Sequence, residues 1–336
     1  MLVPRVDISP LATGAAVGAS AAISTVAADI DAACRDTGFF SIIGHGVDPG
    51  LRSRLDAHAR EFFALEEMEK SQIAMSRGGR AWRGWFPTGG ELTSGIPDRK
   101  EGLYFGAELD ADDARVRAGL PLHGPNLFPS RPDALRAAVL EYLETMTRLG
   151  HTVMRGVALA LRLEPDWFEH ELTADPTILF RIFCYPPTPD QQDEWGVREH
   201  TDYGLLTIVG QDDVGGLQVR SPRGWIDVPP DPDAFVCNIG DMLERMTGGR
   251  YRSTPHRVRN EATTSRLSFP FFFDPGWAAQ VRPIPEIAEG ARPEDAQADD
   301  ARARWDRANV HKLTGTYGEY LLSKVAKVFP ALTSEL

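Results

Sequence analysis

Two histidines and one aspartate have the residue types and the spacing of a mononuclear metal site. His200 and Asp202 stand two positions apart in a segment that favours a strand, so both side chains are expected on one face. His256 begins another expected strand. Two imidazoles and one carboxylate on one face of an ion are the ligand set of non-haem iron(II) oxygenases. The alternatives are a surface histidine beside a solvated aspartate, and a core histidine at position 256.

A basic residue lies in an apolar segment that follows. Arg266 and Ser268 are expected on one face of a buried strand, because the run around them includes Phe269, Phe271 and Phe273. A buried guanidinium is costly without an anionic partner. A bound dicarboxylate would supply one through a bidentate contact. An ion pair with a distant acidic residue is the alternative.

Four ordered motifs resemble the isopenicillin N synthase-like branch of the iron(II)/2-oxoglutarate oxygenases. They are His200-Thr201-Asp202-Tyr203-Gly204, Asn238-Ile239-Gly240-Asp241-Met242, Ser253-Thr254-Pro255-His256-Arg257-Val258 and Arg266-x-Ser268. The resemblance runs from about residue 3 to residue 325. It implies an α+β fold with a mainly β core, a double-stranded β-helix (jelly roll) flanked by N-terminal helices and a C-terminal helix.

The resemblance also implies the co-substrates. Iron(II) would be held by His200, Asp202 and His256, and 2-oxoglutarate by Arg266 with help from Ser268 and Tyr185. Dioxygen would then oxidise, and by default hydroxylate, a small molecule, with release of succinate and carbon dioxide. Two alternatives stay open: an isopenicillin N synthase-like iron oxidase that uses no 2-oxoglutarate, and a catalytically silent jelly-roll binding protein.

The substrate side of the site is indicated by a local likeness to bacterial ethylene-forming enzyme over residues 117–125, 200–219 and 246–258. That likeness places an acidic residue, Glu91, where an amine of the substrate could bind. The residues expected to face the substrate are Glu91, Thr93, Arg181, Phe183 and Tyr203. Phe183 replaces an asparagine of plant relatives. Glu319-Tyr320 stands where ethylene-forming enzyme presents an Arg-Cys pair, so efficient ethylene formation is not expected.

Hydrophobic periodicity and turn residues predict the elements that position these side chains. Helices are expected over residues 21–36, 49–75 with a break near 65, 132–163 and 304–327. Strands are expected over residues 3–8, 39–43, 99–106, 177–185, 197–209, 215–220, 224–228, 234–239, 255–259 and 265–273. Loops are expected over residues 76–95, 111–131 and 286–303. Asp241 is expected to cap a short helix over 242–246 that Gly248 ends.

The chain of 336 residues is expected to form a single oxygenase domain over 1–336. Its helix-rich part (1–175) would pack on a jelly-roll core (176–275), followed by a C-terminal loop and helix (276–336). A net charge of −12 argues against nucleic acid or an anionic membrane as the main partner, which leaves a small-molecule substrate. The three cysteines form no CxxC pair, which favours a reducing, cytoplasmic location. No apolar run is long enough for a membrane span.

Overall fold

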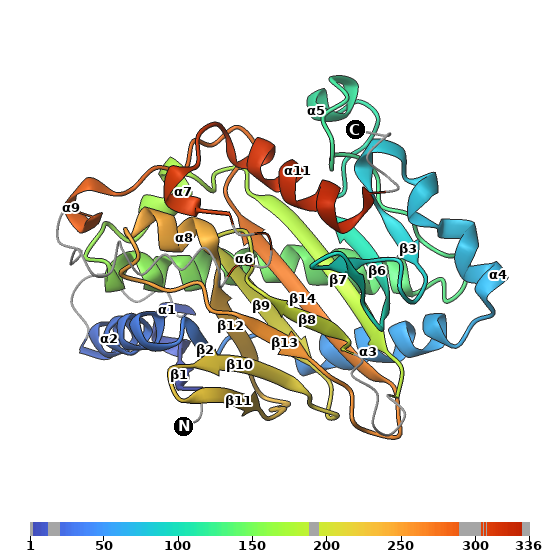
Figure 1. Cartoon of the computed structure of the whole chain (residues 1–336), viewed down its shortest axis with the longest axis horizontal. Coiled ribbons are helices and arrows are strands. Elements are labelled where there is room, and N and C mark those ends of the chain that lie inside the picture. The colour runs from blue at the N-terminus through green and yellow to red at the C-terminus, as the bar shows by residue number, and fades with distance from the viewer. Residues whose placement is uncertain are drawn as a thin grey trace.

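A large and a small β-sheet form the core of the protein (Figure 1). The computed structural model describes residues 3–12, 21–187, 195–288, 304, 306 and 308–330. The large sheet has the strand order β1-β2-β12-β9-β14-β7-β6-β3, and the small sheet has the order β11-β10-β13-β8. Among the pairings within these sheets, only β1 with β2 is parallel. The mainly β, jelly-roll-like core is therefore confirmed.

The strands of the large sheet are β1 (Arg5–Asp7), β2 (Phe39–Ile43), β3 (Gly84–Phe86), β6 (Glu101–Gly106), β7 (Thr177–Tyr185), β9 (Leu206–Gln211), β12 (Phe235–Ile239) and β14 (Arg266–Asp274). Those of the small sheet are β8 (Val197–His200), β10 (Leu217–Ser221), β11 (Gly224–Val228) and β13 (His256–Val258). The strands β4 (Leu92–Thr93) and β5 (Ile96–Pro97) form a separate hairpin. All residues of β7 are buried, as are all but one of β14, which explains why both read as almost continuous apolar runs.

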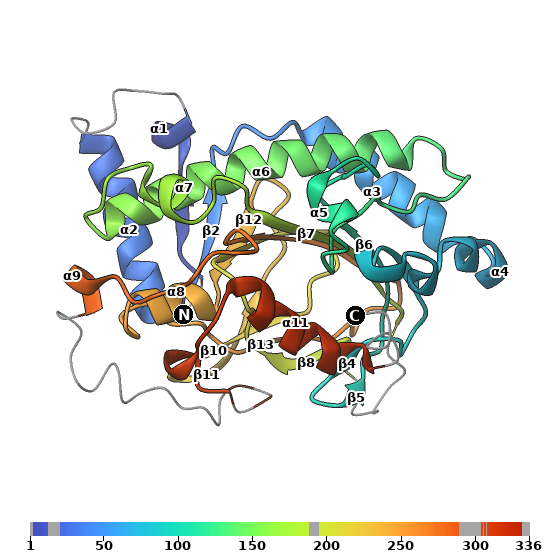
Figure 2. The ribbon, with the colours of Figure 1, turned by 90° about the horizontal axis from the view of Figure 1, so that it is seen from above.

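Helices cover one face of the large sheet, and the C-terminal helix lies on the other side, as Figure 2 shows. The longest helix, α6 (Leu135–Ala160), contacts β9 and β14, and its apolar stripe is buried. At Gly150 a Cβ would lie 2.4 Å from the ring of Phe273, so the glycine permits this close packing. The other helices that frame the core are α2 (Ala21–Asp36), α3 (Pro49–Phe63), α8 (Asp241–Met246) and α11 (Tyr317–Val328). The remaining helices are short: α1 (Ser9–Ala12), α4 (Glu67–Lys70), α5 (Ala114–Arg117), α7 (Trp167–Glu171) and α9 (Pro285–Ala288), with 3₁₀ turns at Ser71–Ile73, Met75–Arg77, Gly79–Ala81 and Val310–Lys312.

Several predicted elements differ from those in the structure. The strand expected over 197–209 is two strands, β8 and β9, in different sheets, with a turn between them. The helix expected over 304–327 begins only at Tyr317, where Thr316 caps it, and residues 310–312 form a 3₁₀ turn instead. The loop expected over 76–95 contains β3 and β4. The loop expected over 286–303 lies mostly outside the described residues.

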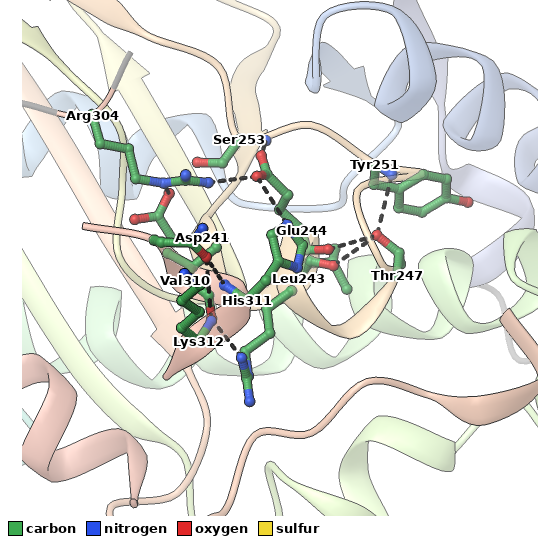
Figure 3. Close-up of polar contacts among 12 residues, drawn as sticks. Asp241, Leu243, Glu244, Thr247, Tyr251, Ser253, Arg304, Val310, His311 and Lys312 are labelled. Carbon is green, nitrogen blue, oxygen red and sulfur yellow. Dashed lines mark hydrogen bonds and ion pairs between the residues drawn. The ribbon is translucent and has the colours of Figure 1, made fainter. Parts of the chain in front are cut away.

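Buried charges fasten the C-terminal segment to α8 (Figure 3). Arg304 lies 3.3 Å from Asp241 Oδ1 and also pairs with Glu244, while the hydroxyl of Tyr320 donates to Asp241 Oδ2 at 2.9 Å. The prediction that Asp241 is an N-cap is wrong: it is the first helical residue, and its carboxylate bonds Arg304 and Tyr320, whereas Gly240 occupies the cap position. Among the described residues, no helix has both the length and the apolar character needed to cross a bilayer.

Candidate metal and co-substrate site

The three predicted metal-binding side chains meet at the end of the small sheet. His200 is the last residue of β8 and stands directly opposite His256 of β13, with their ring centroids 4.2 Å apart. Asp202 Oδ1 lies 3.8 Å from Nε2 of His200 and 3.7 Å from Nε2 of His256. One potential ligand atom from each residue lies within 4.8 Å of the others, so a single ion could contact all three.

The route by which Asp202 reaches this point differs from the prediction. It does not share a strand face with His200, because β8 ends at His200 and Asp202 lies in the following turn. Close packing of Asp274 against Gly204 fixes this turn. A Cβ at position 204 would lie 1.4 Å from Oδ1 of Asp274, so only glycine permits the contact. The backbone N–H of Asp241 also donates to the carbonyl of Asp202 at 2.8 Å. Contacts with residues distant in sequence therefore turn the carboxylate toward the imidazoles.

Hydrogen bonds to backbone carbonyls orient both imidazoles. Nδ1 of His200 lies 2.8 Å from the carbonyl oxygen of Arg198, and Nδ1 of His256 lies 3.2 Å from that of Thr254. With Nδ1–H donating to these carbonyls, each Nε2 keeps a lone pair for a metal. Burial, together with the neighbouring His200, lowers the pKa of His256 to about 4, which favours its neutral ring.

Asp202 is held by two polar side chains that the sequence analysis did not assign to the site. Oδ2 accepts hydrogen bonds from Thr207 Oγ1 at 2.6 Å and from Asn238 Nδ2 at 2.7 Å. Burial alone would raise the pKa of Asp202, but the two histidines and these hydrogen bonds bring it below its ordinary value. Asn238 belongs to a recognised motif, whereas nothing in the sequence marks Thr207.

Arg266, Ser268 and Tyr185 converge on a neighbouring part of the same cavity. Arg266 is 1% exposed, and its Nη2 lies 3.4 Å from Gln211 Oε1. Its Nε and Nη1 have no hydrogen-bond partner. The Tyr185 hydroxyl lies 3.3 Å from Ser268 Oγ, and the Tyr185 ring centroid lies 4.9 Å from Arg266 Cζ. Within the described part of the chain Arg266 has no ion-pair partner, which leaves room for an anionic ligand.

A cavity of about 140 Å³ joins the metal-binding side chains to the rest of the predicted site. Its walls include every residue predicted for metal, co-substrate or substrate: Glu91, Thr93, Arg181, Phe183, Tyr185, His200, Asp202, Tyr203, His256, Arg266 and Ser268. Apolar side chains near the C-terminus complete the wall: Leu321, Val325, Val328 and Phe329. The cavity therefore collects side chains from most of the chain's length.

Glu91 has a partner that the sequence analysis missed. Lys100 Nζ lies 2.8 Å from Glu91 Oε2 and 2.5 Å from Asp98 Oδ2. The hydroxyl of Tyr104 donates to Glu91 Oε1, and Thr93 Oγ1 donates to Asp98 at 2.8 Å. Lys100 is 2% exposed, and its pKa is raised because these two acids outweigh the effect of burial. Glu91 thus already faces an internal cation.

The reason given for expecting little ethylene formation is wrong. Glu319 forms a capping box with Thr316 at the start of α11, and Tyr320 bonds Asp241. Neither side chain lines the cavity, so neither contacts a substrate bound there. The absence of efficient ethylene formation stays a prediction without that support.

Comparisons with known proteins agree with this site. Residues 176–275 match the model of the 2OG-Fe(II) oxygenase superfamily, and residues 3–131 match that of the "non-haem dioxygenase in morphine synthesis N-terminal" family. A Dictyostelium discoideum protein named "Probable iron/ascorbate oxidoreductase" is 47% identical, over 93% of this chain and 91% of its own. A homoarginine-6-hydroxylase of Arabidopsis thaliana is 36% identical, over 91% of this chain and 90% of its own.

A solved structure of a 2OG-Fe(II) oxygenase family protein from Caulobacter crescentus superposes with a TM-score of 0.77 at 26% identity, over 97% of this chain and 98% of that one. The extent of these matches and the arrangement of the His-Asp-His cluster lead to one assignment. The chain belongs to the 2OG-Fe(II) oxygenase superfamily and is an iron(II)- and 2-oxoglutarate-dependent dioxygenase.

Proposed function

We propose that His200, Asp202 and His256 hold the iron, and that Arg266, with Ser268 and Tyr185, holds the distal carboxylate of 2-oxoglutarate. The observation that carries this proposal is the guanidinium of Arg266, which is buried in the wall of the metal-site cavity with two nitrogen atoms unpartnered. A carboxylate of a bound ligand would supply the charge and the hydrogen-bond acceptors that this guanidinium lacks. The isopenicillin N synthase-like alternative would place a substrate carboxylate there instead.

The bound iron supplies dioxygen activation, for which decarboxylation of 2-oxoglutarate to succinate provides two electrons. The protein binds the iron and the co-substrate, orients them, and excludes water from the cavity. His200 and His256 present their Nε2 atoms to the metal, and Asn238 and Thr207 keep Asp202 Oδ1 turned toward them. The apolar side chains of α11 keep water from the cavity.

The remaining wall is proposed to face the primary substrate, a small molecule that is hydroxylated. Its residues are Glu91, Thr93, Arg181, Phe183 and Tyr203. The similarity to a homoarginine-6-hydroxylase supports an amino acid as the substrate and hydroxylation as the outcome.

Two broader proposals concern the whole chain. We propose that residues 1–336 act as a single domain, which is supported by one continuous hydrophobic core that runs from Val6 to Phe329 in the described residues. We also propose a reducing, cytoplasmic location, which is supported by three buried cysteines that are all free.

Anaerobic reconstitution tests the assignment. The wild type should bind one iron(II) per chain and, on exposure to dioxygen with substrate, release succinate. The His200→Ala, Asp202→Ala and His256→Ala variants should lose iron, whereas His170→Ala, at an exposed histidine of α7, should not. Full iron content in all three variants would refute the ligand assignment. Dioxygen uptake that is independent of 2-oxoglutarate would instead favour the oxidase.

A further inference from the structure

Arg181 presents a charge to the cavity that no other side chain neutralises directly. It lies in the middle of β7, is 9% exposed, and lines the cavity. Its Nη1 has no hydrogen-bond partner, and in the described part of the chain no carboxylate forms an ion pair with it. A buried guanidinium in this state is costly unless an anion comes into direct contact with it.

The position of the Arg181 guanidinium is fixed by aromatic rings. Its Cζ lies 3.4 Å from the ring centroid of Tyr104, the residue opposite it on β6, and 5.4 Å from that of Phe272. The Tyr104 hydroxyl is in turn bonded to Glu91. Stacking orients the plane of a guanidinium without consuming its N–H donors, so these stay available along its edge.

The nearest acidic cluster has another cation as its direct ion-pair partner. Glu91 and Asp98 both contact Lys100, at 2.8 Å and 2.5 Å. The cavity therefore does not offer an unpaired acid at Glu91, contrary to the sequence-based expectation of an amine there. The cation without a direct partner is Arg181.

A second arginine is available for 2-oxoglutarate. Arg266 is paired in register with Tyr185, which is four residues from Arg181 on the same strand. At about 3.3 Å per residue, Arg181 and Tyr185 are separated by about 13 Å along the strand. Phe183 stands between them on the same cavity-lining face. The two arginine side chains therefore enter the cavity from well-separated backbone positions, which suits the binding of two different ligands.

We propose that Arg181 binds a carboxylate of the primary substrate, so that the enzyme oxidises an organic acid. This inference rests on the proposed function, because it assumes that Arg266 already holds the co-substrate. Glu91, Lys100 and Tyr104 then act as positioning residues that hold the stacked guanidinium in place.

The test is anaerobic binding of paired probes to the protein loaded with iron(II) and 2-oxoglutarate, followed through its visible absorption. The probes are L-homoarginine, an aliphatic acid and an aromatic acid, each with its primary amide. At least one acid should bind about tenfold or more tightly than its amide. The Arg181→Gln variant should lose this preference, and Arg181→Lys should regain part of it. Both variants should keep wild-type affinity for 2-oxoglutarate.

Three outcomes would overturn the proposal: amides that bind as tightly as acids, no binding of any acid, or a loss of 2-oxoglutarate affinity in Arg181→Gln as large as in Arg266→Gln. The last outcome would assign Arg181 to the co-substrate. If Arg181→Gln does not fold, the ratio of acid to amide affinity in the wild type decides. Failure of the wild type to bind iron or 2-oxoglutarate would be seen before any probe is added, and would count against the proposed function instead.

Discussion

Asp202 combines two roles in one carboxylate. Oδ2 accepts hydrogen bonds from Thr207 and Asn238, while Oδ1 faces the two imidazoles. A carboxylate that could rotate freely would present either oxygen and would lose entropy on binding a metal. The two hydrogen bonds remove that freedom before the metal binds.

Removal of these hydrogen bonds should weaken iron binding without removing a ligand. We expect Asn238→Ala and Thr207→Val each to lower the affinity for iron(II) by about 10- to 100-fold, which is the usual effect of losing an outer partner of a metal ligand. Thr207→Ser keeps the hydroxyl and serves as the control. Iron titration by competition with a chelator measures the change. Unaltered affinity in both variants would mean that Asp202 needs no such support.

Arg266 should dominate the binding of 2-oxoglutarate. Loss of a buried, bidentate charge-assisted contact costs about 3 kcal/mol, so Arg266→Ala should raise the apparent constant for 2-oxoglutarate by roughly a hundredfold. Arg148→Ala removes an exposed arginine of α6 and should have no such effect. Steady-state succinate release at varied 2-oxoglutarate measures both. Near-normal affinity in Arg266→Ala would favour the oxidase alternative.

At the scale of secondary-structure elements, the sequence pattern predicted those helices and strands whose formation depends on the local burial of apolar residues. The strands β7 and β14 and the long helix α6 were predicted because each buries a continuous apolar surface. The turn after His200 was not predicted, because it depends on Asp274 packing against Gly204, a contact between residues far apart in sequence. Lys100 and Thr207 were missed although their partners lie only two to nine residues away, because these side chains meet only through the path of the intervening turns.

The charged cluster between α8 and the C-terminal segment should contribute strongly to stability. Arg304→Ala would leave Asp241 and Glu244 buried without their cation, and breaking such a pair costs about 3–5 kcal/mol. Tyr320→Phe removes one hydrogen bond to Asp241 and should cost about 1 kcal/mol. Denaturant unfolding of both variants measures these costs. Equal, small losses would show that the buried acids find other partners or become protonated.

At the scale of the whole molecule, the cavity is closed by segments from both ends of the chain. Its wall runs from Phe39 on β2 to Phe329 just after α11. Binding of iron and 2-oxoglutarate should therefore stabilise distant segments together, since a ligand that binds only the folded chain raises its stability by mass action. Asp274 lines the same cavity and bonds both Leu205 and Tyr317.

Asp274 should make the stability of the molecule depend on pH. It lies at the end of β14, accepts a hydrogen bond from the backbone N–H of Leu205 at 3.1 Å, and is also bonded by the hydroxyl of Tyr317 at the start of α11. Burial, against the effect of these hydrogen bonds, raises its pKa from 3.8 to about 7. Between these values the folded chain keeps a proton that the unfolded chain releases. The contribution of Asp274 to stability is therefore present at low pH and declines as the pH rises toward 7.

The Asp274→Asn variant, which cannot ionise, isolates this contribution. Its melting temperature should rise relative to that of the wild type as the pH increases from about 4 to 7, and the difference should level off above that range. The change should amount to a few kcal/mol at most, because each pKa unit corresponds to about 1.4 kcal/mol. Asp133→Asn, at an exposed carboxyl, should show no comparable trend. A constant difference across this range would mean that Asp274 is already ionised at low pH, and that its hydrogen bonds outweigh the cost of burial.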